Sequence, residues 1–180
     1  RGLYEMSEEA TQAYEDARSN IASFIGAKPE ELVFTRNATE ALNLVAYSWG
    51  RANVREGDVI VTTEMEHHSN FLPWKLLATE KNAKLEVVKI TDEGLLDEDS
   101  LDEKLKLGPK IVAFTHASNV LGTINDAKGI AKRVKDAGAI CVLDGAQSVP
   151  HMPVSVKEIG CDFMAFSGHK MLGPMGIGGL

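Results

Sequence analysis

The stretch SGHKMLGPMGIGG, residues 167–179, places a lysine, Lys170, between a short polar run and several glycines. A lysine held in a partly dry site loses its proton more readily and becomes a nucleophile towards aldehydes, with which it forms a Schiff base. Ser167 and His169 could bind an anion beside it. We expect the glycines to let the backbone approach a bulky group closely. The alternative is an ordinary solvated loop lysine.

The segment DGAQSV provides an acid and an amide close together. Asp144 ends an apolar run, and Gln147 follows three residues later. An acid at the end of a buried run is costly unless a cation or a hydrogen-bond donor meets it. A protonated ring nitrogen would serve this purpose. The alternative is a turn aspartate that accepts hydrogen bonds from nearby backbone amides.

The segment RNATEALN is typical of a helix start. Asn37 can cap the helix, and Glu40 can answer it as a capping box. Thr39 then lies in the first turn, where free backbone amides and the helix dipole favour an anion such as phosphate. The alternative is a well-capped helix that binds nothing.

The segment EMEHHSN presents two adjacent histidines, His67 and His68. Adjacent residues on an extended segment point to opposite sides, and no cluster of Cys, Asp or Glu with metal-ligand spacing supports them, so we predict no metal site. A flat imidazole here could instead stack on a planar ligand. The alternative is a loop histidine with a satisfied hydrogen bond.

Each of these segments follows an apolar run that is typical of a strand covered on both faces. The predicted strands are residues 31–35, 58–63, 85–90, 110–116, 139–145 and 162–167, and the chain closes on a further strand-like pattern, GIGGL. Helical spacing is found over residues 7–26, 38–50, 70–82, 98–107 and 126–138. This alternation predicts an α/β fold with a mainly parallel (mixed) sheet and helices on both faces. Such sheets bind ligands at the carboxyl ends of their strands, where these segments lie.

Taken together, the loops offer an anion site, a flat ring for stacking, an acid for a ring nitrogen, an amide for a ring oxygen and a reactive lysine. This set predicts pyridoxal 5′-phosphate as the cofactor. Asp144 would keep the pyridine nitrogen protonated, so that the ring accepts electrons from a substrate carbanion. Lys170 would hold the cofactor and then move the α-proton of an amino acid.

Composition excludes several other classes of protein. The 180 residues carry 26 acids against 19 bases, a formal charge of −7, which argues against a nucleic-acid partner. No apolar run approaches the roughly 20 residues of a membrane span, and the N-terminus is not a signal peptide, so we predict a cytoplasmic protein with no membrane partner. Cys141 and Cys161 lie in strand-like runs without metal-ligand spacing, and we expect both to be core residues.

The motifs RNATEALNLVAYSWG, MEHHSNFLPW, THASNVLGT, VLDGAQSVPH and FSGHKMLGPMGIG occur in this order. They resemble the group II cysteine desulfurases, a branch of the class V aminotransferase family. The resemblance implies a homodimer of fold type I that uses pyridoxal phosphate to convert L-cysteine into L-alanine. It also implies transfer of persulfide sulfur to an acceptor protein for iron–sulfur cluster assembly.

Other functions remain open at this point. Selenocysteine lyase, which acts on L-selenocysteine, and other class V members share nearly all of these loops. A different class of hypothesis is a non-catalytic module that binds pyridoxal phosphate, or a sulfur-transfer partner without lyase activity.

The resemblance also implies roles for individual residues around the ring. Lys170 in SGHK would be the lysine that holds the cofactor, and His67 in MEHH would stack on the pyridine ring and assist acid–base steps. Asp144 in DGAQ would pair with the ring nitrogen, and Gln147 would meet the phenolic oxygen.

The phosphate and the substrate have their own implied partners. Thr39, Ser167 and His169 would hold the phosphate, and Asn119 in ASNVLGT would lie near the substrate carboxylate. The family often has two threonines in a row at Thr39. Here Ala38 stands in place of the first, so one possible hydroxyl is absent and we expect slightly lower phosphate affinity.

The family's persulfide-forming cysteine and its carboxylate-binding arginine lie on a later segment, and neither Cys141 nor Cys161 matches that cysteine. We therefore expect residues 1–180 to be the large cofactor-binding domain of a chain about twice as long. The N-terminal segment and the C-terminal small domain would be absent, and the 180 residues would be inactive by themselves.

Overall fold

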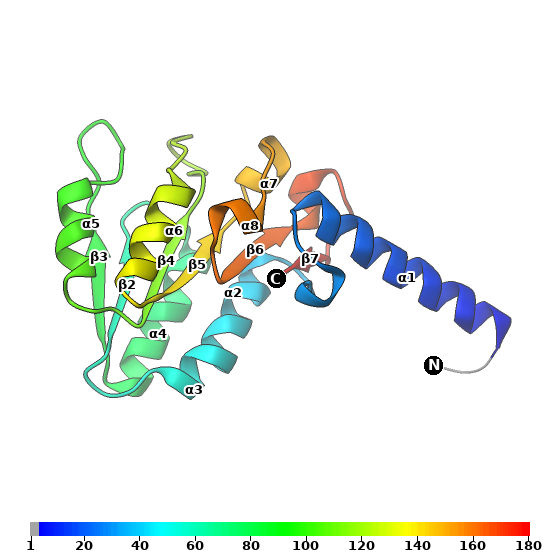
Figure 1. Ribbon diagram of the computed structural model, residues 1–180, viewed down its shortest axis with the longest axis horizontal. Helices are drawn as coiled ribbons and strands as arrows, with labels where there is room; N and C mark the ends of the chain where they lie inside the picture. The colour runs from blue at the N-terminus through cyan, green and yellow to red at the C-terminus, as the bar shows by residue number, and fades with distance from the viewer. Residues whose placement is uncertain (1–3) are drawn as a thin grey trace.

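The computed structural model describes residues 4–180. Their strands form one seven-stranded sheet in the order β1-β7-β6-β5-β4-β2-β3 (Figure 1). The strands are β1 (Phe34–Thr35), β2 (Val59–Thr63), β3 (Lys84–Val88), β4 (Ile111–Thr115), β5 (Ile140–Asp144), β6 (Phe163–Ser167) and β7 (Gly178–Gly179). Strands β2 to β6 are parallel, and β7 runs antiparallel to both β1 and β6. The prediction of a mainly parallel, mixed sheet is confirmed.

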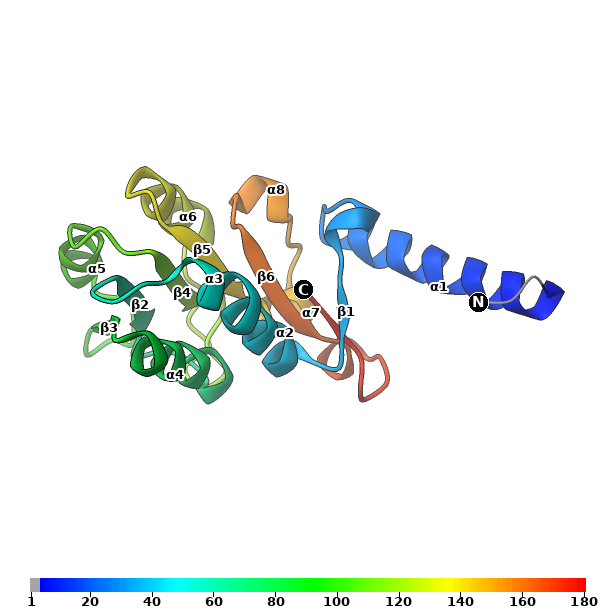
Figure 2. The same ribbon diagram turned by 90° about the horizontal axis from the view of Figure 1, so that it is seen from below.

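Helices connect the strands and cover both faces of the sheet. They are α1 (Glu5–Phe24), α2 (Ala38–Val45), α3 (Arg51–Asn53), α4 (Leu72–Lys81), α5 (Glu98–Leu105), α6 (Ala127–Asp136), α7 (Ser148–His151) and α8 (Val156–Ile159). Figure 2 shows α2, α3 and α4 on one face and α5, α6 and α8 on the other, while α1 extends beyond the β1 edge. Among the described helices, none is long and apolar enough to cross a membrane.

Each face of the sheet has its own hydrophobic core. On one face Leu42 of α2 and Trp74 of α4 are fully buried against the sheet. On the other, α6 presents a stripe of buried residues at helical spacing, Ala127, Ile130, Ala131 and Val134. The two cores hold the central strands β4, β5 and β6 between them, and these strands carry the loops predicted to do chemistry.

The structure refines several predicted elements. Pro29–Glu31 forms a 3₁₀ turn, so β1 is shorter than the predicted strand over 31–35. The predicted helix over 38–50 is α2 followed by a π-helical turn, Ala46–Gly50. The helices α7 and α8 have four residues each, too few for a periodic pattern to reveal.

The two cysteines differ in their surroundings. Cys141 lies within β5 and is fully buried, as predicted, whereas Cys161 precedes β6 and is partly exposed at the edge of the core. The prediction that both are core residues was therefore wrong for Cys161. The reason is that β6 begins at Phe163, one residue after the predicted start of the strand, so Cys161 lies before the strand and packs against the edge of the core.

Candidate active site

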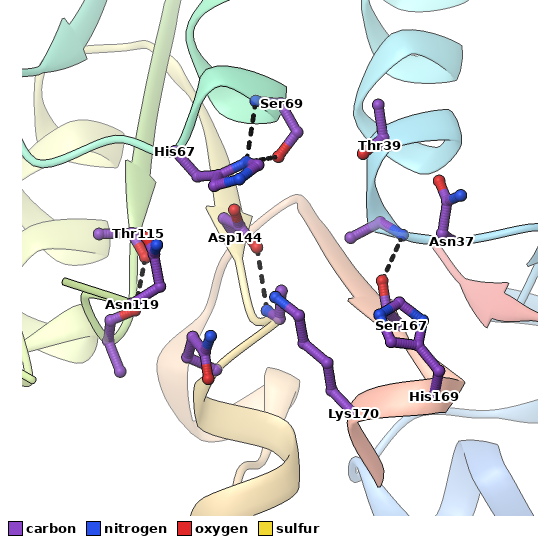
Figure 3. A pocket seen from close by; sticks show the side chains of 14 residues that line it. Asn37, Thr39, His67, Ser69, Thr115, Asn119, Asp144, Ser167, His169 and Lys170 are labelled. Atoms are coloured by element: carbon purple, nitrogen blue, oxygen red, sulfur yellow. Dashed lines mark hydrogen bonds between the residues drawn. The ribbon is translucent and has the colours of Figure 1, made fainter. Parts of the chain in front are cut away.

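A cavity of about 260 Å³ lies beyond the carboxyl ends of β4, β5 and β6, beside the start of α2. Figure 3 shows the side chains that line it. The lining residues are Asn37, Ala38, Thr39, His67, Ser69, Thr115, Ala117, Asn119, Asp144, Ala146, Gln147, Ser167, His169 and Lys170. The eight residues predicted from the sequence to form the site are all among them, although they come from five separate loops.

The start of α2 is capped as predicted, with one difference. Asn37 Oδ1 accepts a 2.9 Å hydrogen bond from the Glu40 amide. The Glu40 carboxylate, however, accepts from the backbone N–H of Arg36 and pairs with the Arg36 guanidinium at 2.9 Å. The expected reciprocal bond of a capping box, to the Asn37 amide, is therefore replaced by one to Arg36, because the ion pair draws the carboxylate to that residue.

The first turn of α2 faces the loop after β6. The Ala38 amide donates to Ser167 Oγ at 2.9 Å, and Thr39, the next residue, lines the cavity. Amides of the first helical turn have no acceptor within the helix, and the helix dipole makes this end positive. The arrangement suits an anion, and His169 lines the same cavity.

Asp144 ends β5 and is only 4% exposed. Its Oδ1 accepts a 2.9 Å hydrogen bond from the Ala146 amide, as in the turn alternative, and no described residue donates to its Oδ2. Burial raises the pKa of this carboxyl, while the Ala146 hydrogen bond and the nearby charges of Lys170 and His67 oppose the rise. A cation in the cavity would compensate for the cost of burying this acid.

Lys170 lies in a 3₁₀ turn, Gly168–Met171, that directly follows β6. Figure 3 shows its side chain extending into the cavity towards Asp144. An amine and a carboxylate therefore approach the same space from adjacent strands. Lys170 is also an exposed residue, as the alternative of a solvated loop lysine requires.

His67 begins the turn after β2, whose 3₁₀ part is His68–Asn70. Its Nδ1 accepts a 3.1 Å hydrogen bond from the Ser69 amide and lies 2.7 Å from Ser69 Oγ. Because a backbone N–H can only donate, Nδ1 is the acceptor nitrogen and the ring proton resides on Nε2.

The neighbouring ring of His68 does not line the cavity, and its centroid is 6.3 Å from that of His67. Within residues 4–180, no group of three or more His, Cys, Asp or Glu side chains is placed to hold a metal ion. Gln147 and Asn119 both line the cavity, on the loops after β5 and β4. Their side-chain amides make no hydrogen bond to other described residues.

One functional candidate was missed by the sequence analysis. Glu66, the residue before His67, accepts hydrogen bonds from Thr63 Oγ1, Asn70 Nδ2 and the Thr115 amide. Desolvation in its packed surroundings raises the pKa of this partly buried carboxyl to about 8, and the charge of Asp144 adds to the rise. The sequence does contain a signal for Glu66, because an acid lies shortly after a buried strand. The two histidines that follow it are the more conspicuous pattern in this segment.

The glycines around Lys170 lie close to other segments of backbone. A Cβ on Gly178 would lie 2.7 Å from Asn37 Cα, and one on Gly168 would lie 2.9 Å from Ile177 O. No glycine is among the described residues that line the cavity. The glycines Gly168 and Gly178 thus let neighbouring segments of backbone pass close together, and their predicted role towards a bulky group stays a prediction.

Comparison with known proteins assigns this arrangement to a family. The aminotransferase class-V family model matches residues 1–180. A probable cysteine desulfurase 2 from Mycobacterium leprae is 52% identical over 185 residues, which cover 99% of this chain and 43% of that protein. A probable cysteine desulfurase from Halalkalibacterium halodurans is 51% identical and covers 99% of this chain and 44% of that protein.

A solved structure shares the fold closely. The apo structure of a cysteine desulfurase from Thermococcus onnurineus superposes with a TM-score of 0.95 at 51% identity, covering 99% of this chain and 44% of that one. The present chain thus spans less than half the length of the relatives that it matches.

Proposed function

The chain belongs to the aminotransferase class-V family, and from this premise we propose that it is the cofactor-binding part of a cysteine desulfurase. This enzyme would convert L-cysteine into L-alanine and pass the sulfur on as a persulfide. The observation that carries the proposal is the convergence of Lys170, Asp144 and the start of α2 on one cavity. The relatives named as cysteine desulfurases support it.

The family uses pyridoxal 5′-phosphate, and the residues present fit that group. The cavity holds a buried acid with one oxygen open for a ring nitrogen, Asp144 Oδ2, and a helix start for a phosphate beside Thr39. Lys170 extends into the same cavity, where its amine would hold the cofactor. Ser167 and His169 would help to hold the phosphate, and Gln147 would donate to the phenolic oxygen.

When bound, the cofactor supplies an electron sink for the charge left on the substrate carbon. The carboxylate of Asp144 favours a proton on the ring nitrogen, because in this buried site an unpaired charge is costly. The amine of Lys170 holds the cofactor and, once free, carries a proton to and from the substrate Cα. The Nδ1 atom of His67 accepts a hydrogen bond from the Ser69 amide within its own turn. Its Nε2–H is therefore the donor available to the cofactor ring or to the substrate.

The sulfur must be taken up by a nucleophilic thiol, and neither cysteine of this chain suits that role. Burial raises the pKa of both thiols, to about 11 for Cys161, so little thiolate exists near neutral pH. We therefore place the cysteine that takes up the sulfur outside these 180 residues. Asn119, at the mouth of the cavity, would contact the substrate carboxylate.

The proposal also covers the partners, the assembly and the location of the complete protein. It includes a homodimer, a sulfur-acceptor protein and a contribution to iron–sulfur cluster assembly. It also includes a cytoplasmic location. Residues 1–180 would form the large domain that binds the cofactor.

The test uses the complete protein that carries this sequence. Pyridoxal phosphate is added, the visible absorbance band is recorded, the adduct is reduced with borohydride, and its position is mapped by peptide mass spectrometry. We expect an adduct on Lys170 that disappears in Lys170→Ala and persists in Lys128→Ala, a control on α6. L-cysteine is then supplied, and alanine and persulfide are measured. An adduct on other lysines, or alanine formation unaffected by Lys170→Ala, would contradict the proposal.

A further inference from the structure

The strands β2 and β4 separate at their carboxyl ends. They pair only as far as Val61 and Val112, although β2 continues to Thr63 and β4 to Thr115. On its other side β4 stays paired with β5, where Thr115 lies opposite Asp144. Beyond Val112, β4 has no strand acceptor on the side that faces β2. The backbone N–H of Thr115 therefore needs an acceptor from elsewhere.

The carboxylate of Glu66 fills the gap between the separated strands. Its Oε1 accepts from the Thr115 amide at 2.9 Å and from Thr63 Oγ1 at 2.6 Å. Its Oε2 accepts from Asn70 Nδ2 at 2.6 Å. One side chain thus takes the place of the missing strand pairing and also reaches the turn after β2.

A second hydrogen bond fixes the orientation of the Asn70 side-chain amide towards Glu66. Asn70 and Trp74 are fully buried, and Asn70 Oδ1 accepts from the indole Nε1 of Trp74 at 3.0 Å. The indole can only donate, so the amide must present its NH₂ group to Glu66. The backbone N–H of Asn70 also donates to the backbone carbonyl oxygen of His67, at 2.8 Å, and this bond closes the turn that begins at His67.

We propose that Glu66 is a positioning residue: its carboxylate joins the separated ends of β2 and β4 to the turn after β2, and so fixes His67 relative to Asp144. The span of the side chain is what matters, because Thr63 and Thr115 lie on one side of the carboxylate and Asn70 on the other. The proposal rests on the proposed function for the part that His67 plays towards the cofactor ring.

The experiment compares Glu66→Gln, Glu66→Asp and Glu66→Ala in the complete protein. Glutamine keeps the length of the side chain and an oxygen for Thr115 but turns an NH₂ group towards Asn70 Nδ2, whereas aspartate keeps the carboxyl group but is one methylene too short. The readouts are the circular dichroism induced in the visible band of bound pyridoxal phosphate, which reports how the ring is held, and the dissociation constant of that cofactor. Glu64→Gln is the matched control, because Glu64 lies on the same loop and is exposed.

We expect Glu66→Ala and Glu66→Asp to lose most of the induced signal and to bind the cofactor about tenfold more weakly, the effect of about one lost hydrogen bond. Glu66→Gln loses only the acceptor for Asn70 Nδ2, so both of its readouts should fall between those of Glu66→Ala and those of the unaltered protein, which Glu64→Gln should match. The proposal is overturned if aspartate preserves the signal while glutamine abolishes it, since charge and not span would then matter. It is also overturned if all three variants lower only the free energy of unfolding.

These readouts separate the two proposals. A protein that binds pyridoxal phosphate with a normal induced signal but does not convert L-cysteine would contradict the proposed function and leave the role of Glu66 standing. Where Glu66→Ala does not fold, the comparison of Glu66→Asp with Glu66→Gln decides the question.

Discussion

Ser167 Oγ accepts a 2.9 Å hydrogen bond from the Ala38 amide, across 129 residues of sequence. Ser167 is the last residue of β6 and Ala38 the first of α2, so this contact joins the loop of Lys170 to the start of the helix. The proposed phosphate end of the cavity and the lysine are thereby held in one rigid unit. A ligand that bridges the two meets a site that is already assembled.

This contact gives the first prediction. Ser167→Ala leaves the buried Ala38 amide without its acceptor, which costs about 1–3 kcal/mol of unfolding free energy. We also expect weaker binding of pyridoxal phosphate, measured by titration of the visible band. Ser155→Ala is the control: it removes the cap of α8, remote from the cavity, at a cost of about 1 kcal/mol. Equal cofactor affinity in the two variants would show that Ser167 contributes to stability alone.

The second prediction concerns pH and the cofactor-free protein. The pKa of Glu66 is raised to about 8 from a reference of 4.5, so the folded state holds a proton that the unfolded state has released over this interval. Folding stability from this group is therefore present at acidic pH and is lost as the pH rises from about 4.5 to about 8, by on the order of a few kcal/mol. Asp144, whose pKa is also raised, acts in the same direction.

The measurement is urea unfolding at a series of pH values from 4.5 to 9, with Glu66→Gln and Glu64→Gln compared. Glu66→Gln cannot ionise, so we expect its stability to fall less steeply over the interval, whereas Glu64→Gln should follow the unaltered protein. Parallel curves for all three proteins would mean that the Glu66 carboxylate is ionised throughout.

The sequence predicts much of the fold because its strands are strongly patterned. The fully buried strand β2 and the stripe of α6 follow from apolar composition and from helical spacing alone. The site loops could be placed because the carboxyl ends of parallel strands meet at one edge, which brings Asp144 and Lys170 together. Short elements such as α7 lie below the length at which a period can be recognised.

Other features depend on contacts that no local pattern records. Gly178 is required by the closeness of Asn37, a residue distant in sequence. Glu66 acquires its role only because β2 and β4 separate beyond Val61 and Val112. Such long-range relationships decide what a residue does, and a single sequence does not reveal them.

The third prediction concerns the cysteines. Burial raises the pKa of Cys141 and Cys161, so both thiols should react slowly with a disulfide reagent in the folded protein and rapidly in guanidinium. Cys161 is partly exposed and should react first. After incubation with L-cysteine, mass spectrometry should find no persulfide on either residue, and Cys161→Ala should leave alanine formation unchanged. A persulfide on Cys161 would contradict the proposed path of the sulfur.

The fourth prediction concerns the tautomer of His67. The Ser69 amide donates to Nδ1 at 3.1 Å, and Ser69 Oγ, 2.7 Å away, can donate to the same nitrogen. Donors to Nδ1 favour the tautomer with its proton on Nε2. This tautomer leaves a donor and not an acceptor for the cavity, so His67 would give a hydrogen bond to a group bound there.

The tautomer can be measured by ¹⁵N NMR of histidine-labelled protein, because protonated and unprotonated ring nitrogens have well-separated shifts. We expect an unprotonated Nδ1 and a protonated Nε2 for His67, and a solution-like mixture for His68, which serves as the internal reference. Ser69→Ala removes the hydroxyl but keeps the backbone N–H, so it should preserve the preference for Nε2–H in weakened form. A proton found on Nδ1 would contradict this assignment: Nδ1–H would then donate to Ser69 Oγ, and Nε2 would face the cavity as an acceptor rather than a donor.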